Sequence, residues 1–302
     1  MRKVHVLTPK KNRTTFYFVR RHLCVYSLMS NTYDVLIVGA GIAGSSLAHS
    51  LSAIVSASRM KPLRIALLER SLSEPQRIVG ELLQPGGVLA LRRLGMESCL
   101  ENIGAIPVYG YCVVESNRSV QIPYPKGYEG RSFHHGRFIM ALREKAKQAI
   151  GVDVIEANVT DLLECEHTQR VIGVRARRKA GGSEALKESF FADLVFVADG
   201  CFSNFRTSVM RGAGLKPSTR SHFVGAILED ARLPIDKYGT VALVRGCGPV
   251  LLYQISNDST RMLVNVKQPL PPSLKVCIFL SLPPFAPLNL HLPGSHPDRD
   301  RS

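Results

Sequence analysis

The stretch YDVLIVGAGIAG at residues 33–44 is an apolar run, rich in β-branched residues, that leads directly into three spaced glycines. This order predicts a strand, a tight turn at Gly39 and the first turn of a helix. Gly41 leaves room for a pyrophosphate next to the backbone, and Gly44 lets the helix close onto the strand. The N–H groups at the helix start would face the anion, which the helix dipole also favours. The stretch therefore predicts a dinucleotide site.

The residues that follow support a complete βαβ unit from Tyr33 to about Arg70. Residues 45–56 are helix-like, and a second apolar strand over 63–70 ends in an acid. Glu69 would then sit where a ribose hydroxyl is bound, although it is further from Gly44 than the usual ~20 residues. A loop insertion over 56–62 explains the extra length. This context favours a dinucleotide fold over a plain glycine turn in another α/β protein.

Composition sets limits on the class of protein. The 302 residues, 45% of them hydrophobic, suit one large or two ordinary globular domains. The formal charge of +15 is partly gathered in residues 1–32, a predicted disordered basic leader, and in RARRK at 175–179, which we interpret as an exposed strand end and hairpin. No nucleic-acid motif or aromatic-basic interleaving accompanies them, so we expect no nucleic-acid partner. An anionic cofactor and a membrane surface fit the charge better.

Metal and membrane-spanning sites are not indicated. The seven cysteines form no C-x-x-C pair, which is typical of a reducing compartment and argues against disulfides or zinc. We interpret His134 and His135 as neighbouring strand residues facing opposite sides, and so predict no metal site. No run reaches about 18 uninterrupted apolar residues, so no transmembrane helix is expected. From 269 to 302 the chain is Pro-rich, and its abrupt composition favours a departure from the coding frame over a natural tail.

The remaining segments alternate between helices and strands. We expect helices over 88–94 and 138–150, strands over 109–124, 152–159 and 171–176, and a mostly β region over 222–266. An apolar strand over 194–198 ends in Asp199-Gly200, with Arg206 six residues on. Asp-Gly is also a common turn pair. After a G-x-G-x-x-G unit, however, it resembles the D-G motif of flavoprotein hydroxylases, which lies near the FAD pyrophosphate.

Six motifs in order carry a closer resemblance. They are ER at 69–70, RIVGELLQPGG at 77–87, IPYP at 122–125, FHHGRF at 133–138, VADG at 197–200 and SHFVG at 221–225. Over roughly 33–275 the chain resembles the squalene epoxidase family. The resemblance implies an α/β fold, with a Rossmann-like FAD-binding domain of flavoprotein hydroxylase type over 33–108 and 137–215. A mostly β substrate domain, over 109–136 and 216–268, would be interleaved with it.

The resemblance also implies site residues. Tyr111 matches the active-site tyrosine near the squalene pocket, and its apolar body with one hydroxyl suits a hydrocarbon site. The arginines suit phosphates because a guanidinium donates two parallel hydrogen bonds. The implied FAD-binding residues are Gly39, Gly41, Ile42, Ala43, Gly44, Glu69, Arg70, Arg77, Leu82, Arg143, Val159, Asp199 and Gly200.

The implied function is an FAD-dependent monooxygenase that epoxidises squalene to 2,3-oxidosqualene with O2 in sterol biosynthesis. Electrons would come from NADPH through NADPH–cytochrome P450 reductase, at the endoplasmic reticulum membrane. Complete family members continue into a second FAD segment and C-terminal membrane helices, and neither is recognisable in this sequence. Two alternatives remain open: another FAD-dependent hydroxylase or reductase acting on an isoprenoid, and a non-catalytic FAD-binding remnant.

Overall fold

The computed structural model describes residues 31–58, 61–178, 187–210, 218–219, 221–245 and 248–267. It also gives the backbone of three two-residue strands: β1 (Val4–His5), β2 (Thr15–Phe16) and β17 (Leu290–His291). β1 and β2 pair antiparallel. The rest of the predicted leader up to residue 30, and the rest of the predicted Pro-rich tail, lie outside the described residues.

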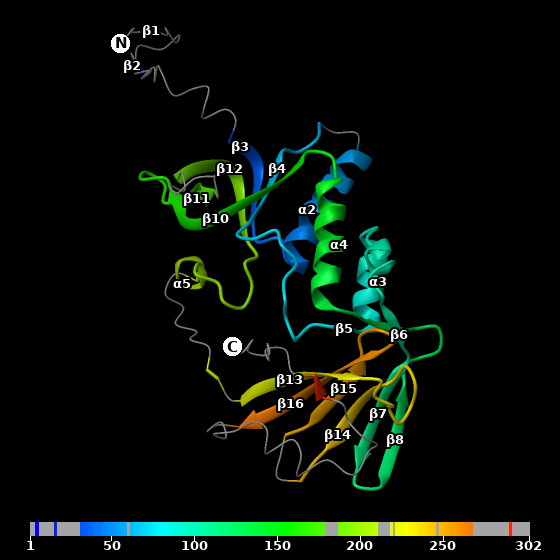
Figure 1. Ribbon diagram of the computed structural model, residues 1–302. Coiled ribbons are helices and arrows are strands. Elements are labelled where there is room, and N and C mark those ends of the chain that lie inside the picture. The colour runs from blue at the N-terminus through cyan, green and yellow to red at the C-terminus, as the bar shows by residue number, and fades with distance from the viewer. Residues whose placement is uncertain are drawn as a thin grey trace, which may run out of the picture.

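A five-stranded barrel forms one part of the molecule (Figure 1). Its strands, in barrel order, are β10 (Val152–Glu164), β11 (Val171–Arg178), β12 (Lys187–Val197), β3 (Thr32–Val38) and β4 (Ile65–Glu69). β12, β3, β4 and β10 are parallel neighbours, whereas β11 runs antiparallel to both β10 and β12. The long β10 pairs with β4 over its first five residues and with β11 from Ala157 onward. One strand therefore joins the parallel unit to the antiparallel strands.

Two helices pack beside the parallel strands. α2 (Ile42–Ala57) and α4 (His135–Lys147) contact each other, and both contact β10. Ile37, Ile65 and Leu67 are fully buried in the core cluster beneath them. Burial of each such side chain is worth about 1.5–3 kcal/mol. Three shorter helices are α3 (Pro85–Arg93), the 3-10 helix η1 (Glu97–Leu100) and α5 (Arg206–Val209).

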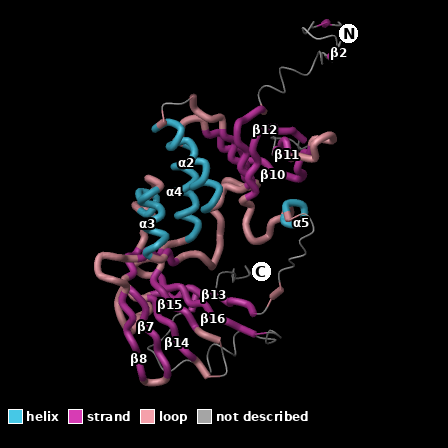
Figure 2. Tube along the Cα trace, turned by 180° about the vertical axis from the view of Figure 1, so that it is seen from behind, coloured by secondary structure: helices cyan, strands magenta, loops and turns pink. Residues whose placement is uncertain are grey.

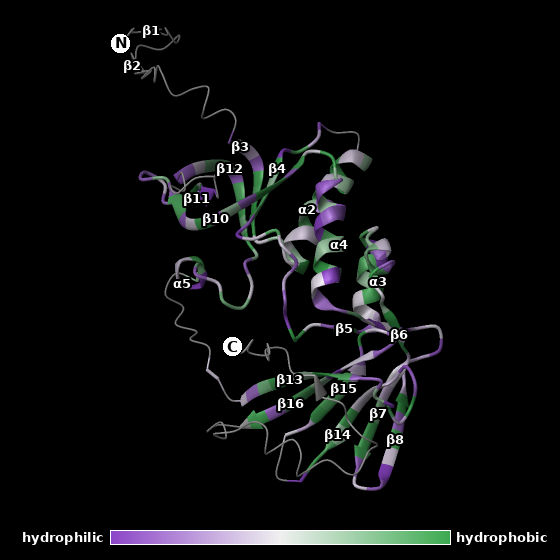
Figure 3. Cartoon of the chain, in the orientation of Figure 1, coloured by the Kyte–Doolittle hydropathy of each residue, from purple (hydrophilic) through white to green (hydrophobic). Residues whose placement is uncertain are grey.

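A seven-stranded sheet forms the other part of the molecule, as Figure 2 shows from behind. Its order is β17, β13 (Ser221–Glu229), β16 (Ser259–Lys267), β15 (Val250–Gln254), β14 (Gly239–Leu243), β7 (Gly110–Glu115) and β8 (Arg118–Pro123). Neighbours are antiparallel except β14 and β7, which are parallel with Gly239 opposite Tyr111. A small sheet of β5 (Leu82–Leu83), β9 (Gly130–Ser132) and β6 (Ile106–Val108) lies at the junction with the helices. Figure 3 shows apolar strands in both parts.

The predicted α/β class is confirmed, and the differences include the ends of several elements and the short strands β5, β6 and β9, which were not predicted. α3 begins at Pro85 rather than at residue 88, because proline suits the first helical position, where its missing N–H is not needed. The interpretation of His134 and His135 as strand residues is wrong. His134 is the N-cap of α4 and His135 is its first residue. The predicted domain boundaries stay predictions.

Two further observations concern the described residues alone. None of their helices is both long and apolar enough to cross a membrane. Nor do three or more of their histidine, cysteine or acidic side chains gather in a group that could hold a metal ion.

Candidate functional site

The predicted phosphate turn lies against the end of β12. Gly39 has a φ of +102°, and a Cβ built on it would lie 2.6 Å from the backbone oxygen of Ala198 and 2.9 Å from Cα of Asp199. Only glycine fits a position that combines a positive φ with so close a backbone. The two glycine-containing motifs of the sequence, around Gly39 and Gly200, therefore meet in space.

The next two glycines have opposite surroundings. A Cβ on Gly44 would lie 1.8 Å from the backbone oxygen of Gly39, so a side chain there would separate α2 from the turn. A Cβ on Gly41, the N-cap of α2, would meet nothing within 4 Å. Ile42 and Ala43 are exposed, and the first turn of α2 carries no acid. The space beside Gly41 thus faces the positive end of a helix dipole, as an anionic ligand requires.

Glu69 braces this turn from the end of β4. Its Oε2 accepts a hydrogen bond from the backbone N–H of Ala40 at 2.8 Å, and its Oε1 accepts one from Ser71 at 3.4 Å. The carboxylate thus holds the backbone of the turn. The ribose contact predicted from the sequence stays a prediction.

Arg143 on α4 also holds the backbone of this turn. Its Nε donates to the backbone oxygen of Ala40 at 2.9 Å, and Nη1 donates to that of Ser73 at 3.1 Å. Nη2 lies 3.5 Å from Glu69 Oε2. Burial lowers the pKa of the Arg143 guanidinium, and the negative charge of Glu69 opposes that shift. One buried side chain therefore ties α4 to the turn, to β4 and to the loop that follows β4.

The other residues predicted to bind FAD differ in how far they are exposed. Arg70 and Arg77 are exposed, and Gly200 is exposed with a φ of +90°. Val159 is buried in the barrel, in one cluster with Val38 and Leu68, which precede the phosphate turn and Glu69. The turn, Glu69, Arg143 and Asp199 are thus brought together, whereas Val159 lies beneath them in the core. The roles of all these residues toward FAD stay predictions.

A cavity of about 180 Å³ lies between residues 79–84 and the seven-stranded sheet. Its walls are mainly apolar, and Leu82 and Tyr111 are among the residues that line it. Gln84, also at the cavity, donates through Nε2 to the hydroxyl of Tyr111 and accepts through Oε1 from the hydroxyl of Tyr124. The two tyrosine rings meet edge to face with centroids 6.0 Å apart. Burial, followed by the neighbouring Tyr111, raises the pKa of Tyr124, so its hydroxyl stays protonated.

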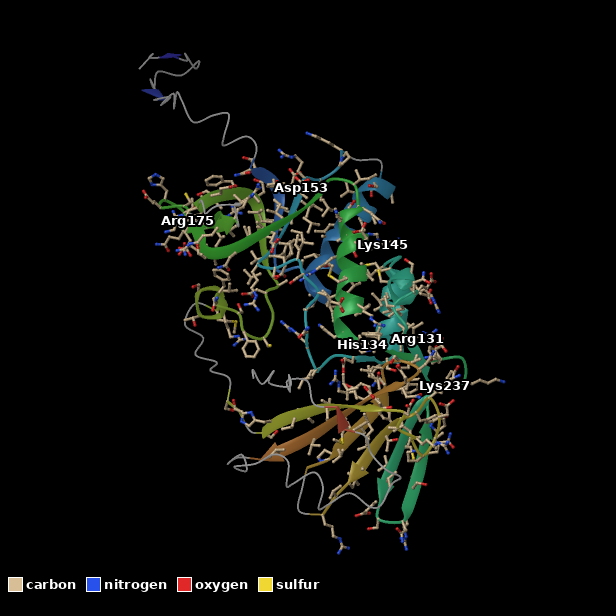
Figure 4. The ribbon with its side chains drawn as sticks, viewed as in Figure 1. Arg131, His134, Lys145, Asp153, Arg175 and Lys237 are labelled. Carbon is tan, nitrogen blue, oxygen red and sulfur yellow. The ribbon has the colours of Figure 1, made fainter. Side chains whose placement is uncertain are left out.

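Figure 4 places the charged residues around this arrangement. His134 lies where α4 meets the seven-stranded sheet, and Lys145 lies toward the other end of the same helix. Arg175 lies on the barrel, away from the sheet and its cavity. The basic cluster at 175–178 is therefore a strand end remote from the cavity, as interpreted from the sequence, and its predicted hairpin lies outside the described residues.

The comparisons with known proteins agree with one another. The family model described as squalene epoxidase matches residues 191–291. The squalene epoxidase of Aspergillus fumigatus is 45% identical over 253 residues, which cover 81% of this chain and 49% of that protein. Squalene epoxidase 1 of Arabidopsis thaliana is 43% identical, over 80% of this chain and 43% of that protein. The squalene monooxygenase of Mus musculus is 41% identical, over 85% of this chain and 43% of that protein. By sequence, this chain belongs to the squalene epoxidase family.

The chain spans about half the length of these squalene epoxidases. Solved structures that are more distant in sequence than these squalene epoxidases share the fold of this chain. The chondrochloren halogenase, a myxobacterial FAD-dependent enzyme, matches with a TM-score of 0.63 at 19% identity, over 79% of this chain and 53% of that one. A probable FAD-dependent monooxygenase of Pseudomonas aeruginosa matches with a TM-score of 0.62 at 18% identity, over 78% and 61%. The flavoprotein hydroxylase type of fold is thus confirmed.

Several residues that line the cavity, or contact residues that line it, were not predicted from the sequence. Gln84 and Tyr124 were not singled out, although both lie in the squalene epoxidase-like motifs at 77–87 and 122–125. Glu81 and Arg261, which form a buried ion pair next to the cavity, are 180 residues apart. Membership of a family motif could have drawn attention to Gln84 and Glu81. No local pattern marks Arg261.

Proposed function

We propose that this chain forms the FAD-binding and substrate-facing part of a monooxygenase that epoxidises squalene to 2,3-oxidosqualene. One observation carries the proposal: a turn at the start of α2 approaches Asp199 at Gly39, is held at Ala40 by Glu69 and Arg143, and leaves open space beside Gly41. This is the arrangement that a pyrophosphate needs. Family membership supports the choice of FAD and of squalene.

The residues around the turn fit FAD. Backbone N–H groups of Ile42 and Ala43 would meet the pyrophosphate, and Glu69 with Arg70 would lie at the adenosine ribose. Arg77 and Leu82 follow toward the cavity and would line the flavin. FAD, when bound, supplies the activation of O2, which side chains alone do not provide. The chain's own part is to hold this cofactor against the cavity.

The cavity suits a hydrocarbon with one reacting alkene. Its walls are mainly apolar, and Tyr111 supplies a hydroxyl that Gln84 orients through a hydrogen bond. In the balanced reaction, squalene, O2, NADPH and a proton yield 2,3-oxidosqualene, water and NADP⁺. The electrons would come through NADPH–cytochrome P450 reductase, at the surface of the endoplasmic reticulum membrane. These partners are proposed on family membership.

The test measures cofactor and product separately. The purified chain is titrated with FAD, with quenching of flavin fluorescence as the signal, and is then incubated with squalene, NADPH, the reductase and ¹⁸O2. We expect saturable FAD binding and one ¹⁸O atom in 2,3-oxidosqualene, identified by mass spectrometry. Absence of FAD binding would overturn the cofactor assignment. FAD binding without product would favour a non-catalytic FAD-binding chain, and oxidation of a different isoprenoid would favour the other hydroxylase hypothesis.

A further inference from the structure

Glu81 and Arg261 form a buried ion pair between segments that lie far apart in the sequence. Arg261 donates through Nε to Glu81 Oε2 at 2.7 Å and through Nη2 to Glu81 Oε1 at 2.9 Å. Only 1% of Glu81 and 5% of Arg261 is exposed. Two parallel charged hydrogen bonds fix both the distance and the angle between the groups. The pair is therefore a rigid link between residues 79–84 and strand β16.

Each partner is itself held by its surroundings. The backbone oxygen of Glu81 accepts a hydrogen bond from Phe133 N at 2.8 Å, directly before α4. Arg261 is paired across the sheet with Tyr253 of β15, and the hydroxyl of Tyr253 lies within the electrostatic influence of Glu81. Burial, and then the charge of Glu81, raises the pKa of Tyr253 and keeps this hydroxyl protonated. The link thus joins the start of α4, near His134 in Figure 4, to two strands of the sheet.

The ion pair affects the cavity through Gln84, which lies three residues after Glu81 in the sequence. Gln84 follows Glu81 through the two residues of β5, and its side chain orients Tyr111 on the sheet. Glu81, Gln84, Tyr111 and Tyr253 all line the same cavity. Because Gln84 and Tyr111 belong to different parts of the fold, sliding of residues 79–84 over the sheet would separate them. A buried ion pair adds little net stability over an apolar pair, whereas its geometry is specific.

We propose that Glu81 and Arg261 are positioning residues that fix residues 79–84 on the seven-stranded sheet and thereby set the polar end of the cavity at Tyr111. The use of squalene as a probe rests on the proposed function. The fixing of residues 79–84 does not, because it is a property of the protein alone.

The experiment compares the chain with Glu81→Gln, Arg261→Met, Arg261→Lys and the double variant Glu81→Met/Arg261→Met. Three quantities are measured: the melting temperature, amide hydrogen exchange over residues 79–84, and squalene affinity from tyrosine fluorescence, since the chain has no tryptophan. The matched control, Arg92→Met, breaks the Arg92–Glu97 pair, whose side chains are 59% and 43% exposed. The control should leave all three quantities unchanged.

Each single neutral variant leaves one buried charge unpaired, so we expect a lower melting temperature and exchange at least about tenfold faster over 79–84. The double variant has no unpaired charge and should regain the melting temperature. Its exchange should stay at least about tenfold faster, and its squalene affinity about tenfold weaker, because the fork geometry is lost. Arg261→Lys keeps the charge without the fork and should show the same fast exchange.

A purely stabilising role predicts a different pattern. If the double variant regained slow exchange and squalene affinity together with its melting temperature, the positioning role would be overturned. Hydrogen exchange over residues 79–84 at the wild-type rate in Arg261→Lys would also overturn the positioning role. If the double variant does not fold, the exchange rate of Arg261→Lys decides between the two roles. If the wild-type chain bound no squalene, the proposed function would fail, while the exchange comparison would still decide the role of the pair.

Discussion

Arg143 on α4 donates a hydrogen bond from Nε to the backbone oxygen of Ala40, between the first two glycines of the phosphate turn, at 2.9 Å. The N–H of the same Ala40 donates to Glu69 at 2.8 Å. Both backbone groups of one turn residue are therefore held by charged side chains from different elements. Such charge-assisted bonds orient the turn before any ligand arrives, which lowers the ordering cost of binding.

Replacement of Arg143 by lysine should weaken this turn. An ammonium group cannot reach Ala40 and Ser73 with the spacing of a guanidinium fork, so the buried carbonyl oxygen of Ala40, or that of Ser73, loses its donor. We expect a loss of about 1.5–3 kcal/mol in the free energy of unfolding, the usual value of hydrogen bonds to charged groups. FAD affinity should fall as well. Denaturant unfolding and flavin fluorescence measure the two effects, with Lys147→Arg on the exposed face of α4 as the control.

Gly41→Ala and Gly44→Ala should separate ligand binding from folding. The methyl group at 44 would overlap the backbone oxygen of Gly39, so we expect a cost of about 3 kcal/mol or more in the free energy of unfolding. The methyl group at 41 meets open space and should change that free energy by less than about 1 kcal/mol. It should nevertheless reduce FAD affinity at least about tenfold, because it occupies the space of the pyrophosphate.

The control for this pair is Gly86→Ala on α3, which also meets nothing within 4 Å. It should leave FAD affinity unchanged and change the free energy of unfolding by less than about 1 kcal/mol. Unchanged FAD binding in Gly41→Ala would contradict the placement of the pyrophosphate at the start of α2.

The sequence predicted the parts of this site that depend on local geometry. The glycine spacing and the apolar strand are properties of one short segment, so the turn at Gly39 could be predicted from them, whereas the closeness of Asp199 was implied only by the resemblance of its D-G motif. The start of α3 could not, because Pro85 fits both a loop and a first helical position. The pairing of Glu81 with Arg261 depends on how a loop lies on a sheet, and no periodicity within either segment encodes that contact.

Acidification should destabilise the protein through His49. Burial, followed by the nearby charge of Lys145, lowers the pKa of His49 from its ordinary value of 6.5. In acid the unfolded chain therefore binds a proton that the folded chain does not, and stability is lost as the pH falls through 6.5. Gln in place of His49 removes this contribution, so the difference in unfolding free energy between pH 8 and about pH 5.5 should shrink.

Denaturant unfolding at the two pH values provides this measurement. His167→Gln, on an exposed turn, is the control and should behave like the wild-type chain. His134 contributes in the same direction as His49, because burial also lowers its pKa, so part of the pH dependence should remain in His49→Gln. A His49→Gln variant with the full wild-type difference would exclude His49 as a source.

Gln84 and Tyr111 should act as a unit toward the substrate. Gln84→Leu keeps the size of the side chain but removes the amide that orients the Tyr111 hydroxyl, and Tyr111→Phe removes that hydroxyl. Each change should lower squalene epoxidation by about 2- to 12-fold, the value of one neutral hydrogen bond, and leave FAD affinity unchanged. Both changes remove the hydrogen bond between Gln84 and Tyr111, and Gln84→Leu also removes the acceptor of the Tyr124 hydroxyl, so the double variant should lose little more than Gln84→Leu alone. Gln148→Leu, exposed at the end of α4, is the control. Losses that multiply in the double variant would show that the two side chains act independently, and Tyr111 would then have to be oriented by other groups.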